Sequence, residues 1–189
     1  MIIGLCGYGR SGKDSLAEVL IEEHEFTRFA FADALKEIAL DIDPWVEIPY
    51  HGFRRLAYVV KDLGWEGAKA YPEVRTFLQR LGTSVRNRAD EDVWLNAVAD
   101  RIDAARIVLA PGNAVITDVR FPNEAEWVKE VGHLVRVTRP GVGPVNGHES
   151  ETAIDHIEAY EFVNGGTLDD LRFYGRRIPH QLASRPPTW

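Results

Sequence analysis

Cysteine is nearly absent from this chain, since Cys6 is the only one in 189 residues. A single thiol excludes an intramolecular disulfide and a cysteine-rich metal site, and it favours a reducing compartment. No apolar run approaches the roughly 18 residues of a membrane-spanning helix, and the opening residues MIIGLC lack the basic segment of a signal peptide. We therefore expect a cytoplasmic protein that does not associate with membranes.

An excess of positive charge is also missing. The chain has 22 Lys and Arg against 29 Asp and Glu, which gives a net charge of −7 with His neutral. This balance argues against non-specific binding to nucleic acid and favours small molecules as partners. At roughly 150 residues per domain, the length predicts one domain over residues 1–189, with at most a small inserted lobe. Whether the protein forms a homodimer is left open.

Short apolar segments alternate with helical patterns along most of the chain. Strands are predicted at residues 2–6, 26–31, 114–117, 133–138 and, weakly, 162–163. Helices are predicted after Gly12, over 33–39 with Asp33 as cap, over 72–85, 91–105 and 122–131, and over 167–177 with Thr167 as cap. Strands that are apolar on both faces predict a five-stranded parallel sheet covered by helices on both sides, an α/β fold.

Three regions give little or no such signal. Residues 43–71 are interrupted by proline and glycine and are expected to be irregular, although 54–63 has helical spacing. A glycine- and proline-rich loop follows Arg139 and is expected to lead into a short helix. The final segment PHQLASRPPTW, residues 179–189, is expected to be a surface tail.

The segment GYGRSGKDS, residues 7–15, matches the pattern GxxxxGK between a predicted strand and a predicted helix. Glycines let backbone N–H groups turn toward phosphate oxygens, the helix N-terminus adds positive charge, and Lys13 can reach the β- and γ-phosphates. We predict a P-loop that binds ATP. The alternative is a glycine-rich turn with a solvated lysine. The ATP-binding residues predicted in this segment are Gly7, Gly9, Arg10, Ser11, Gly12, Lys13, Asp14 and Ser15.

The residue after the lysine departs from the usual pattern. A Ser or Thr hydroxyl normally binds Mg²⁺ there, whereas this chain has Asp14 followed by Ser15. We expect Asp14 or Ser15 to take part in magnesium binding, with helix capping by Asp14 as the alternative. Asp118 ends the third predicted strand, where P-loop proteins usually place an acidic residue near Mg²⁺.

Arginines follow the predicted strands at the edge where ligands bind in open parallel sheets. Arg120 comes two residues after Asp118, and a surface ion pair of the two is the alternative. Arg136 and Arg139 end the fourth strand. Arg139 opens a loop with His148, Glu149 and Glu151 that has the character of a closing lid, at about residues 139–152. The alternative for this acidic group is an ordinary helix start.

One predicted helix carries a polar stripe. Arg75, Gln79 and Arg86 stand at i, i+4 and i+11, which places them on one helical face. They would line a substrate pocket, or else form a solvated outer face. The histidines have no metal-ligand spacing, so no zinc site is proposed.

Taken in order, several motifs resemble those of the bacteriophage deoxynucleoside monophosphate kinases. The similarity runs from about residue 2 to residue 172, and GKD in place of GK[ST], DVRFPNE and HESE are its most specific parts. The other motifs are FADALKEIA, LQRLGTSVRNRADEDVWLNAV, RVTRPG and FVNGGTLDDL.

This resemblance implies a P-loop NTPase fold of three α/β/α layers, with a helical acceptor-binding region at about 43–105 and an arginine-bearing lid. It implies transfer of the γ-phosphoryl group of ATP to deoxynucleoside 5′-monophosphates, with Mg²⁺, in the host cytoplasm if a phage encodes the protein. Lys13, Asp118, Arg120 and Arg139 would be catalytic, and Asn164 would lie near the adenine. The residues expected to bind the acceptor are Lys36, Arg75, Gln79, Arg86, Arg120 and Glu151.

Two other interpretations stay open from the sequence. One is another small-molecule P-loop kinase, of the dephospho-coenzyme A or phosphomevalonate kinase type. The other is a nucleotide-binding regulatory module with little turnover, which would need neither the arginines nor the polar stripe.

Overall fold

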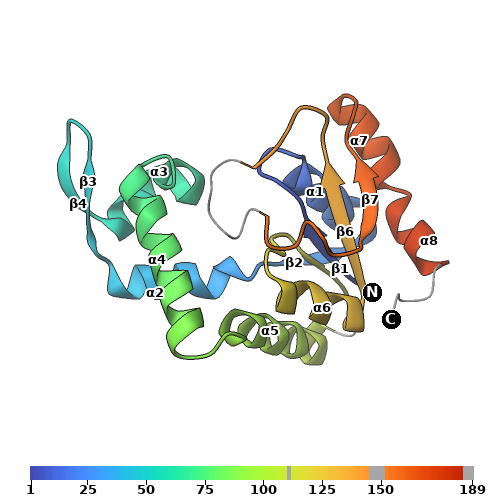
Figure 1. Ribbon diagram of the computed structural model, residues 1–189, viewed down its shortest axis with the longest axis horizontal. Helices are drawn as coiled ribbons and strands as arrows, with labels where there is room; N and C mark the ends of the chain where they lie inside the picture. Colours follow the sequence, from blue (N-terminus) through green and yellow to red (C-terminus); the bar gives the residue numbers. More distant parts are fainter. Residues whose placement is uncertain (110–111, 145–151, 185–189) are drawn as a thin grey trace. The chain divides into compact units, whose positions relative to one another are not determined.

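The computed structural model (Figure 1) describes residues 1–109, 112–144 and 152–184. The chain divides into two compact units, one formed by Met1–Ala30 with Val98–Trp189 and the other by Phe31–Ala97. The P-loop segment falls in the first unit, and the predicted polar stripe falls in the second.

The first unit is built on a five-stranded parallel sheet. Its strands are β1 (Ile2–Cys6), β2 (Phe26–Phe29), β5 (Asn113–Ile116), β6 (His133–Thr138) and β7 (Tyr160–Val163), in the order β2-β5-β1-β6-β7. The central strand β1 pairs with β5 and β6, and all pairings in the sheet are parallel. The predicted sheet is confirmed, including its weakest strand.

Helices cover both faces of this sheet. Helices α1 (Lys13–His24), α7 (Leu168–Gly175) and α8 (Ile178–Ala183) bury apolar side chains with Ile3, Leu5 and Val137 on one face. Helix α6 (Pro122–Val131) contacts β1 and β6, and its Val128 lies over Gly4 on the other face. The predicted three-layer α/β/α arrangement is therefore present in this unit. Thr167 caps α7 as predicted, because its hydroxyl accepts a hydrogen bond from the Asp170 amide.

The C-terminal segment differs from the expected surface tail. Residues 178–183 form α8, and Ile178 and Leu182 are 1% and 2% exposed within the core of the first unit. These two apolar side chains stand four residues apart, on one helical face, and Pro179 is tolerated because it lies in the first turn. The prediction of a tail was therefore wrong for this helix, and residues 185–189 lie outside the described part of the chain.

The second unit is mainly helical with one antiparallel hairpin. It contains α2 (Ala32–Ile42), β3 (Trp45–Ile48), β4 (Gly52–Arg55), α3 (Leu56–Ala68), α4 (Pro72–Arg88) and the first residues of α5 (Val93–Leu109). Its core is formed by Ala39, Val46, Ile48, Leu56, Val59, Ala68, Val74 and Leu78. The unit therefore has its own hydrophobic core. Most of it coincides with the acceptor-binding region expected at about 43–105.

The hairpin and α3 correct the expectation that residues 43–71 are irregular. Val46 and Ile48 are buried while Trp45 and Glu47 are exposed, so β3 alternates between two faces. Asp43 fixes the base of the hairpin, because its carboxylate accepts hydrogen bonds from Arg55 Nε at 2.9 Å and from the Ala57 amide at 2.8 Å. The amide hydrogen bond is the main cause that lowers the pKa of Asp43.

The start of α2 also differs in detail from the prediction. Its N-cap is Phe31, and Asp33 lies inside the first turn. A carboxylate there still interacts favourably with the positive end of the helix.

Candidate active site

The P-loop joins the end of β1 to the start of α1, as the glycine spacing predicted. Gly12 has a φ of 104°, in the left-handed region that favours glycine. A Cβ atom at Gly12 would lie 2.4 Å from Asn164 Nδ2, so the approach of Asn164 also requires a glycine here. Asn164 Nδ2 donates a hydrogen bond to the carbonyl oxygen of Ser11 at 2.9 Å. The conformation of the loop is therefore held from the end of β7.

This contact gives Asn164 a role that the sequence did not indicate. The residue is 6% exposed, and its side-chain amide binds the P-loop backbone. Its expected place near the adenine of ATP stays a prediction.

Lys13 is the last residue of the P-loop pattern, and its side chain folds back onto the first residues of the loop. Its Nζ donates hydrogen bonds to the carbonyl oxygens of Gly7 and Tyr8, both at 2.7 Å. The ammonium group is thereby held beside the backbone that would surround a phosphate chain.

Ser11 provides an observation that favours a polar ligand. It is 1% exposed, and its Oγ has no hydrogen-bond partner among the described residues. A buried hydroxyl without a partner costs free energy, so a phosphate oxygen that accepts its hydrogen bond would remove that cost.

Asp14 and Ser15 occupy the first turn of α1. The N-cap position of α1 is Gly12, which has no capping side chain, so Asp14 is not the capping residue considered as an alternative. Its carboxylate is exposed near the positive end of the helix, and Ser15 is half-buried. Both side chains offer oxygen atoms, the ligand type that Mg²⁺ prefers.

Asp118 and Arg120 follow β5, and a buried glutamate fixes the backbone beside them. Glu124 is 3% exposed, and its Oε2 accepts hydrogen bonds from the Arg120 amide at 2.8 Å and the Phe121 amide at 3.0 Å. Sequence reasoning missed Glu124. The signal for it was the Pro-Asn-Glu start of α6, because a glutamate at the third helical position typically bonds back to the N-cap amide.

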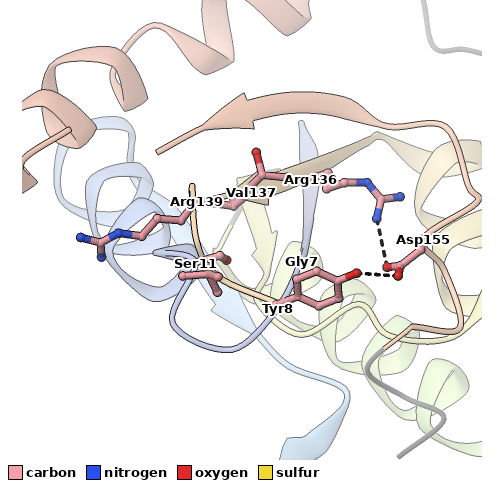
Figure 2. A pocket seen from close by; sticks show the side chains of 9 residues that line it. Gly7, Tyr8, Ser11, Arg136, Val137, Arg139 and Asp155 are labelled. Carbon is pink, nitrogen blue, oxygen red and sulfur yellow. Dashed lines mark hydrogen bonds and ion pairs between the residues drawn. The ribbon is translucent and has the colours of Figure 1, made fainter. Parts of the chain in front are cut away.

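Two neighbouring pockets lie at this edge of the sheet. The larger has a volume of about 210 Å³ and lies between the P-loop and the end of β6 (Figure 2). It is lined by Gly7, Tyr8, Ser11, Arg136, Val137, Thr138, Arg139, Val142 and Asp155. The smaller, of about 20 Å³, is lined by Gly7, Gly9, Lys13, Asp118, Val119, Arg120, Arg136, Ile154 and Asp155. The structure thus brings Lys13, Asp118 and Arg120 together at one pocket and places Arg139 at the adjoining one.

The two arginines of β6 and its end have different surroundings. Arg139 is exposed at the rim of the larger pocket. The Arg136 side chain is 12% exposed and forms an ion pair with Glu161 at 3.1 Å. Its Nη2 donates hydrogen bonds to the carbonyl oxygens of Ile154 and Ile157, at 2.8 and 2.6 Å. Arg136 therefore anchors the chain at residues 154–157, and only Arg139 has the exposure expected of a lid arginine.

The remaining predicted residues belong to the second unit or lie outside the described residues. Lys36 forms an ion pair with Asp33 at 3.6 Å. Helix α4 carries Arg75, Gln79 and Arg86 on one face, which confirms the helix but does not test their contact with an acceptor. His148, Glu149 and Glu151 lie outside the described residues, and with them most of the expected lid; residues 152–157 that follow form turns.

Cys6, the only cysteine of the chain, is not activated for catalysis. Burial raises the pKa of Cys6 to about 11, so this cysteine stays protonated and is not a nucleophile at neutral pH. Within 1–109, 112–144 and 152–184, no three His, Cys, Asp or Glu side chains cluster so as to hold a metal ion. Mg²⁺ in kinases is usually held by one or two carboxylates together with substrate phosphates, and Asp14 and Asp118 offer such carboxylates.

None of the described helices combines the length and the apolar character needed to cross a membrane.

Comparison with solved structures finds kinases at low similarity. A dephospho-CoA kinase from Campylobacter jejuni has a TM-score of 0.49 and 11% identity, and covers 95% of this chain and 96% of its own. A sugar kinase from Janibacter sp. has a TM-score of 0.47 and 12% identity, with 96% and 95% covered. Likeness of this degree assigns no activity. No family model matches the chain.

Comparison with curated proteins finds two viral relatives. A protein of Acanthamoeba polyphaga mimivirus, provisionally named a deoxynucleotide monophosphate kinase, is 29% identical over 94% of this chain and 94% of its own length. The deoxynucleoside-5′-monophosphate kinase of Escherichia phage T5 is 26% identical over 71% of this chain and 74% of its own. The chain is thus similar to two viral proteins that are named as deoxynucleotide or deoxynucleoside monophosphate kinases, which confirms the resemblance predicted from its motifs.

Proposed function

We propose that this protein is a kinase that transfers the γ-phosphoryl group of ATP to a deoxynucleoside 5′-monophosphate. The observation that carries the proposal is the convergence of Lys13, Asp118 and Arg120 on one small pocket beside the P-loop. The P-loop explains how a nucleotide would bind. Arg120 adds a second positive charge beside Lys13, and a reaction between two phosphate-bearing ligands requires such a charge. The names of the two viral relatives support the same reaction.

Each residue at the pocket has a distinct task in this proposal. The P-loop backbone and the Ser11 hydroxyl bind phosphate oxygens of ATP, and Lys13 neutralises charge on the β- and γ-phosphates. Arg120 stabilises the transferring phosphoryl group, and Arg139 approaches it from the rim of the larger pocket. Phosphoryl transfer depends on in-line positioning and charge neutralisation, so no protein nucleophile is needed.

Magnesium would be held by Asp14, Ser15 and Asp118 together with phosphate oxygens. When bound, the ion neutralises charge on the β- and γ-phosphates. Asp118 is half-buried at the pocket that Lys13 lines, whereas Asp14 is exposed on the first turn of α1. Asp118 would therefore hold the ion at the pocket itself, and Asp14 would contribute a carboxylate from the first turn of α1.

The role of Asp14 can be tested by a single substitution. We expect Asp14→Asn to raise the Mg²⁺ concentration at half-maximal rate by about 3-fold or more, because a carboxylate ligand of the ion is lost. Glu18→Gln, on the exposed surface of the same helix, is the matched control. A magnesium titration that is identical in both variants and the wild type would remove Asp14 from the metal site.

The acceptor would bind through residues of the second unit. Lys36, Arg75, Gln79 and Arg86 are the predicted contacts, with Glu151 from the lid. Guanidinium groups bind phosphate in a bidentate manner, and the amide of Gln79 suits the edge of a base. The protein would supply deoxynucleoside diphosphates in the cytoplasm of the infected host if a phage encodes it.

The test is the release of ADP from Mg-ATP with each of dAMP, dGMP, dCMP and dTMP, their ribose counterparts, and no acceptor. We expect turnover to depend on at least one deoxynucleotide and to be low without acceptor, because an acceptor completes the site. ADP release that no nucleotide stimulates would contradict the proposal. Dephospho-coenzyme A, phosphomevalonate and shikimate as further acceptors then distinguish another small-molecule kinase from a regulatory module.

A further inference from the structure

Tyr8 and Asp155 lie 147 positions apart in the sequence and meet beside the P-loop. The Tyr8 hydroxyl donates a hydrogen bond to Asp155 Oδ2 at 2.6 Å, and Figure 2 shows the hydroxyl and the Arg136 guanidinium both pointing toward this carboxylate. A bond from a hydroxyl to a carboxylate is charge-assisted and is among the stronger hydrogen bonds in proteins. It therefore ties the P-loop to the turns at residues 152–157.

Arg136 supports Asp155 from the other side. Its Nη1 lies 3.7 Å from Asp155 Oδ1, while its Nη2 holds the carbonyl oxygens of Ile154 and Ile157. The residues on both sides of Asp155 are thus fixed to strand β6 through one side chain. Because Glu161 also pairs with this guanidinium, the charge of Arg136 is balanced by two carboxylates. This makes Arg136 an anchor for Asp155.

Tyr8 also connects this anchor to the lysine of the P-loop. Its carbonyl oxygen accepts a hydrogen bond from Lys13 Nζ at 2.7 Å, and its side chain binds Asp155. Any shift of Tyr8 that follows loss of the Asp155 bond therefore moves an acceptor that holds the lysine. A displacement of about 1 Å at such a group is enough to lower an enzyme's rate substantially.

Tyr8, Arg136 and Asp155 all lie at the pockets beside the P-loop. Tyr8, Arg136 and Asp155 line the larger pocket, and Arg136 and Asp155 also line the smaller one with Lys13, Asp118 and Arg120. On the basis of the kinase function proposed above, we infer that Tyr8 and Asp155 are positioning residues, which act on phosphoryl transfer by holding Lys13 through the Tyr8 backbone. Arg136 fixes Asp155 in the orientation that this requires.

The experiment removes single polar groups and measures kcat and the KM for the acceptor separately. We expect Tyr8→Phe and Asp155→Ala each to lower kcat by about 10-fold, with the acceptor KM changed less than about 2-fold, because Lys13 acts on the transferring phosphoryl group. The double variant should be no slower than the slower single variant, since both substitutions break the same link. Multiplicative effects in the double variant, or single variants with wild-type kcat, would overturn the inference.

Tyr160→Phe is the matched control. Tyr160 donates its hydroxyl to Gln181 Oε1 at 2.7 Å, between β7 and α8, and it lines neither pocket. The control loses the same chemical group, so we expect it to keep the wild-type kcat. A decrease equal to that of Tyr8→Phe would show that the loss is a general effect on stability.

A binding measurement separates this inference from the proposed function. If the wild type binds ADP but shows no acceptor-dependent turnover, the proposed kinase function fails. Weaker ADP binding by Tyr8→Phe than by Tyr160→Phe, measured by titration calorimetry, would then still support the link to the P-loop. Equal ADP affinity of the two variants in that case would overturn it.

Discussion

The strands of the two units differ in how deeply they are buried, and therefore in how clearly the sequence predicts them. In the first unit, strands buried between helix layers appear in the sequence as short continuous apolar runs, and the polar residues follow directly at the strand ends. In the second unit, a two-stranded hairpin has one exposed face, with Trp45 61% and Phe53 60% exposed. Strand β3 alternates over only four residues, and β4 has no buried residue. The comparison shows that a sequence indicates fold and chemistry together where parallel strands are buried, and indicates much less where a small hairpin is half-exposed.

The largest expected effect is on turnover and belongs to the first unit. We expect Lys13→Ala and Arg120→Ala each to lower kcat by at least about 100-fold, or about 2.7 kcal/mol, because both cations act on transition-state charge. Steady-state kinetics with saturating ATP and acceptor, together with circular dichroism, check this. Lys61→Ala, at an exposed position of α3, is the control. Near-normal turnover of either variant with an unchanged spectrum would remove that residue from the mechanism.

The next expected effect concerns two glycines that differ in their surroundings. Alanine at Gly12 would meet Asn164 and adopt a φ of 104°. Alanine at Gly64, which has a φ of 67° at the kink within α3, would meet no atom within 4 Å beyond its own stretch of backbone. We expect Gly12→Ala to lower the free energy of unfolding by about 1–3 kcal/mol, and Gly64→Ala by about 1 kcal/mol, since only the first adds a steric clash to the backbone strain. Urea unfolding of both variants measures the difference, and equal losses would contradict it.

A smaller effect is expected from the polar stripe of the second unit. We expect Arg75→Ala and Gln79→Ala to raise the KM for the acceptor by about 10-fold while the KM for ATP stays unchanged, because these residues are proposed to bind only the monophosphate. Arg80→Ala, an exposed arginine on the same helix, is the control. An increase in the KM for ATP, or no change in either constant, would separate α4 from acceptor binding.

The smallest effect is a pH dependence of stability in the first unit. Burial and the nearby N-terminal ammonium group lower the pKa of His133 below its usual value of 6.5. The unfolded chain therefore binds more protons than the folded one below about pH 6.5, so the free energy of unfolding rises with pH up to that value. We expect His133→Asn to flatten this rise by less than about 1 kcal/mol in urea unfolding at pH 5.5 and 7.5. A steeper rise in His133→Asn would contradict the assignment.

The sequence predicted the first unit well because the signals for its strands, P-loop and helix cap lie within a few neighbouring residues. The inner strands β1 and β5 are buried on both faces, so their apolar pattern needs no knowledge of their partners. The positive φ of Gly7 and Gly12 in the P-loop favours glycine at both positions. Thr167 was likewise predictable as a cap because its partner Asp170 lies three residues away.

The features that were missed depend on contacts between distant residues. Tyr8 and Asp155 are 147 positions apart, and Asn164 reaches Ser11 across 153 positions. Helix α8 is helical because Ile178 and Leu182 fill the core beside α1 and α7, although its proline-rich sequence favoured a tail. The hairpin depends on Asp43, whose carboxylate binds Arg55 and the Ala57 amide. Such contacts follow from the fold and have no local signature in the sequence.

The most direct test of phosphoryl transfer is identification of the product. The wild-type protein would be incubated with Mg-ATP and one deoxynucleoside monophosphate, and the nucleotides separated by ion-exchange chromatography over time. The proposed reaction predicts one deoxynucleoside diphosphate for each ADP, with no free phosphate, because the phosphoryl group passes to the acceptor and not to water. ADP and inorganic phosphate in equal amounts, with the monophosphate unchanged, would contradict it.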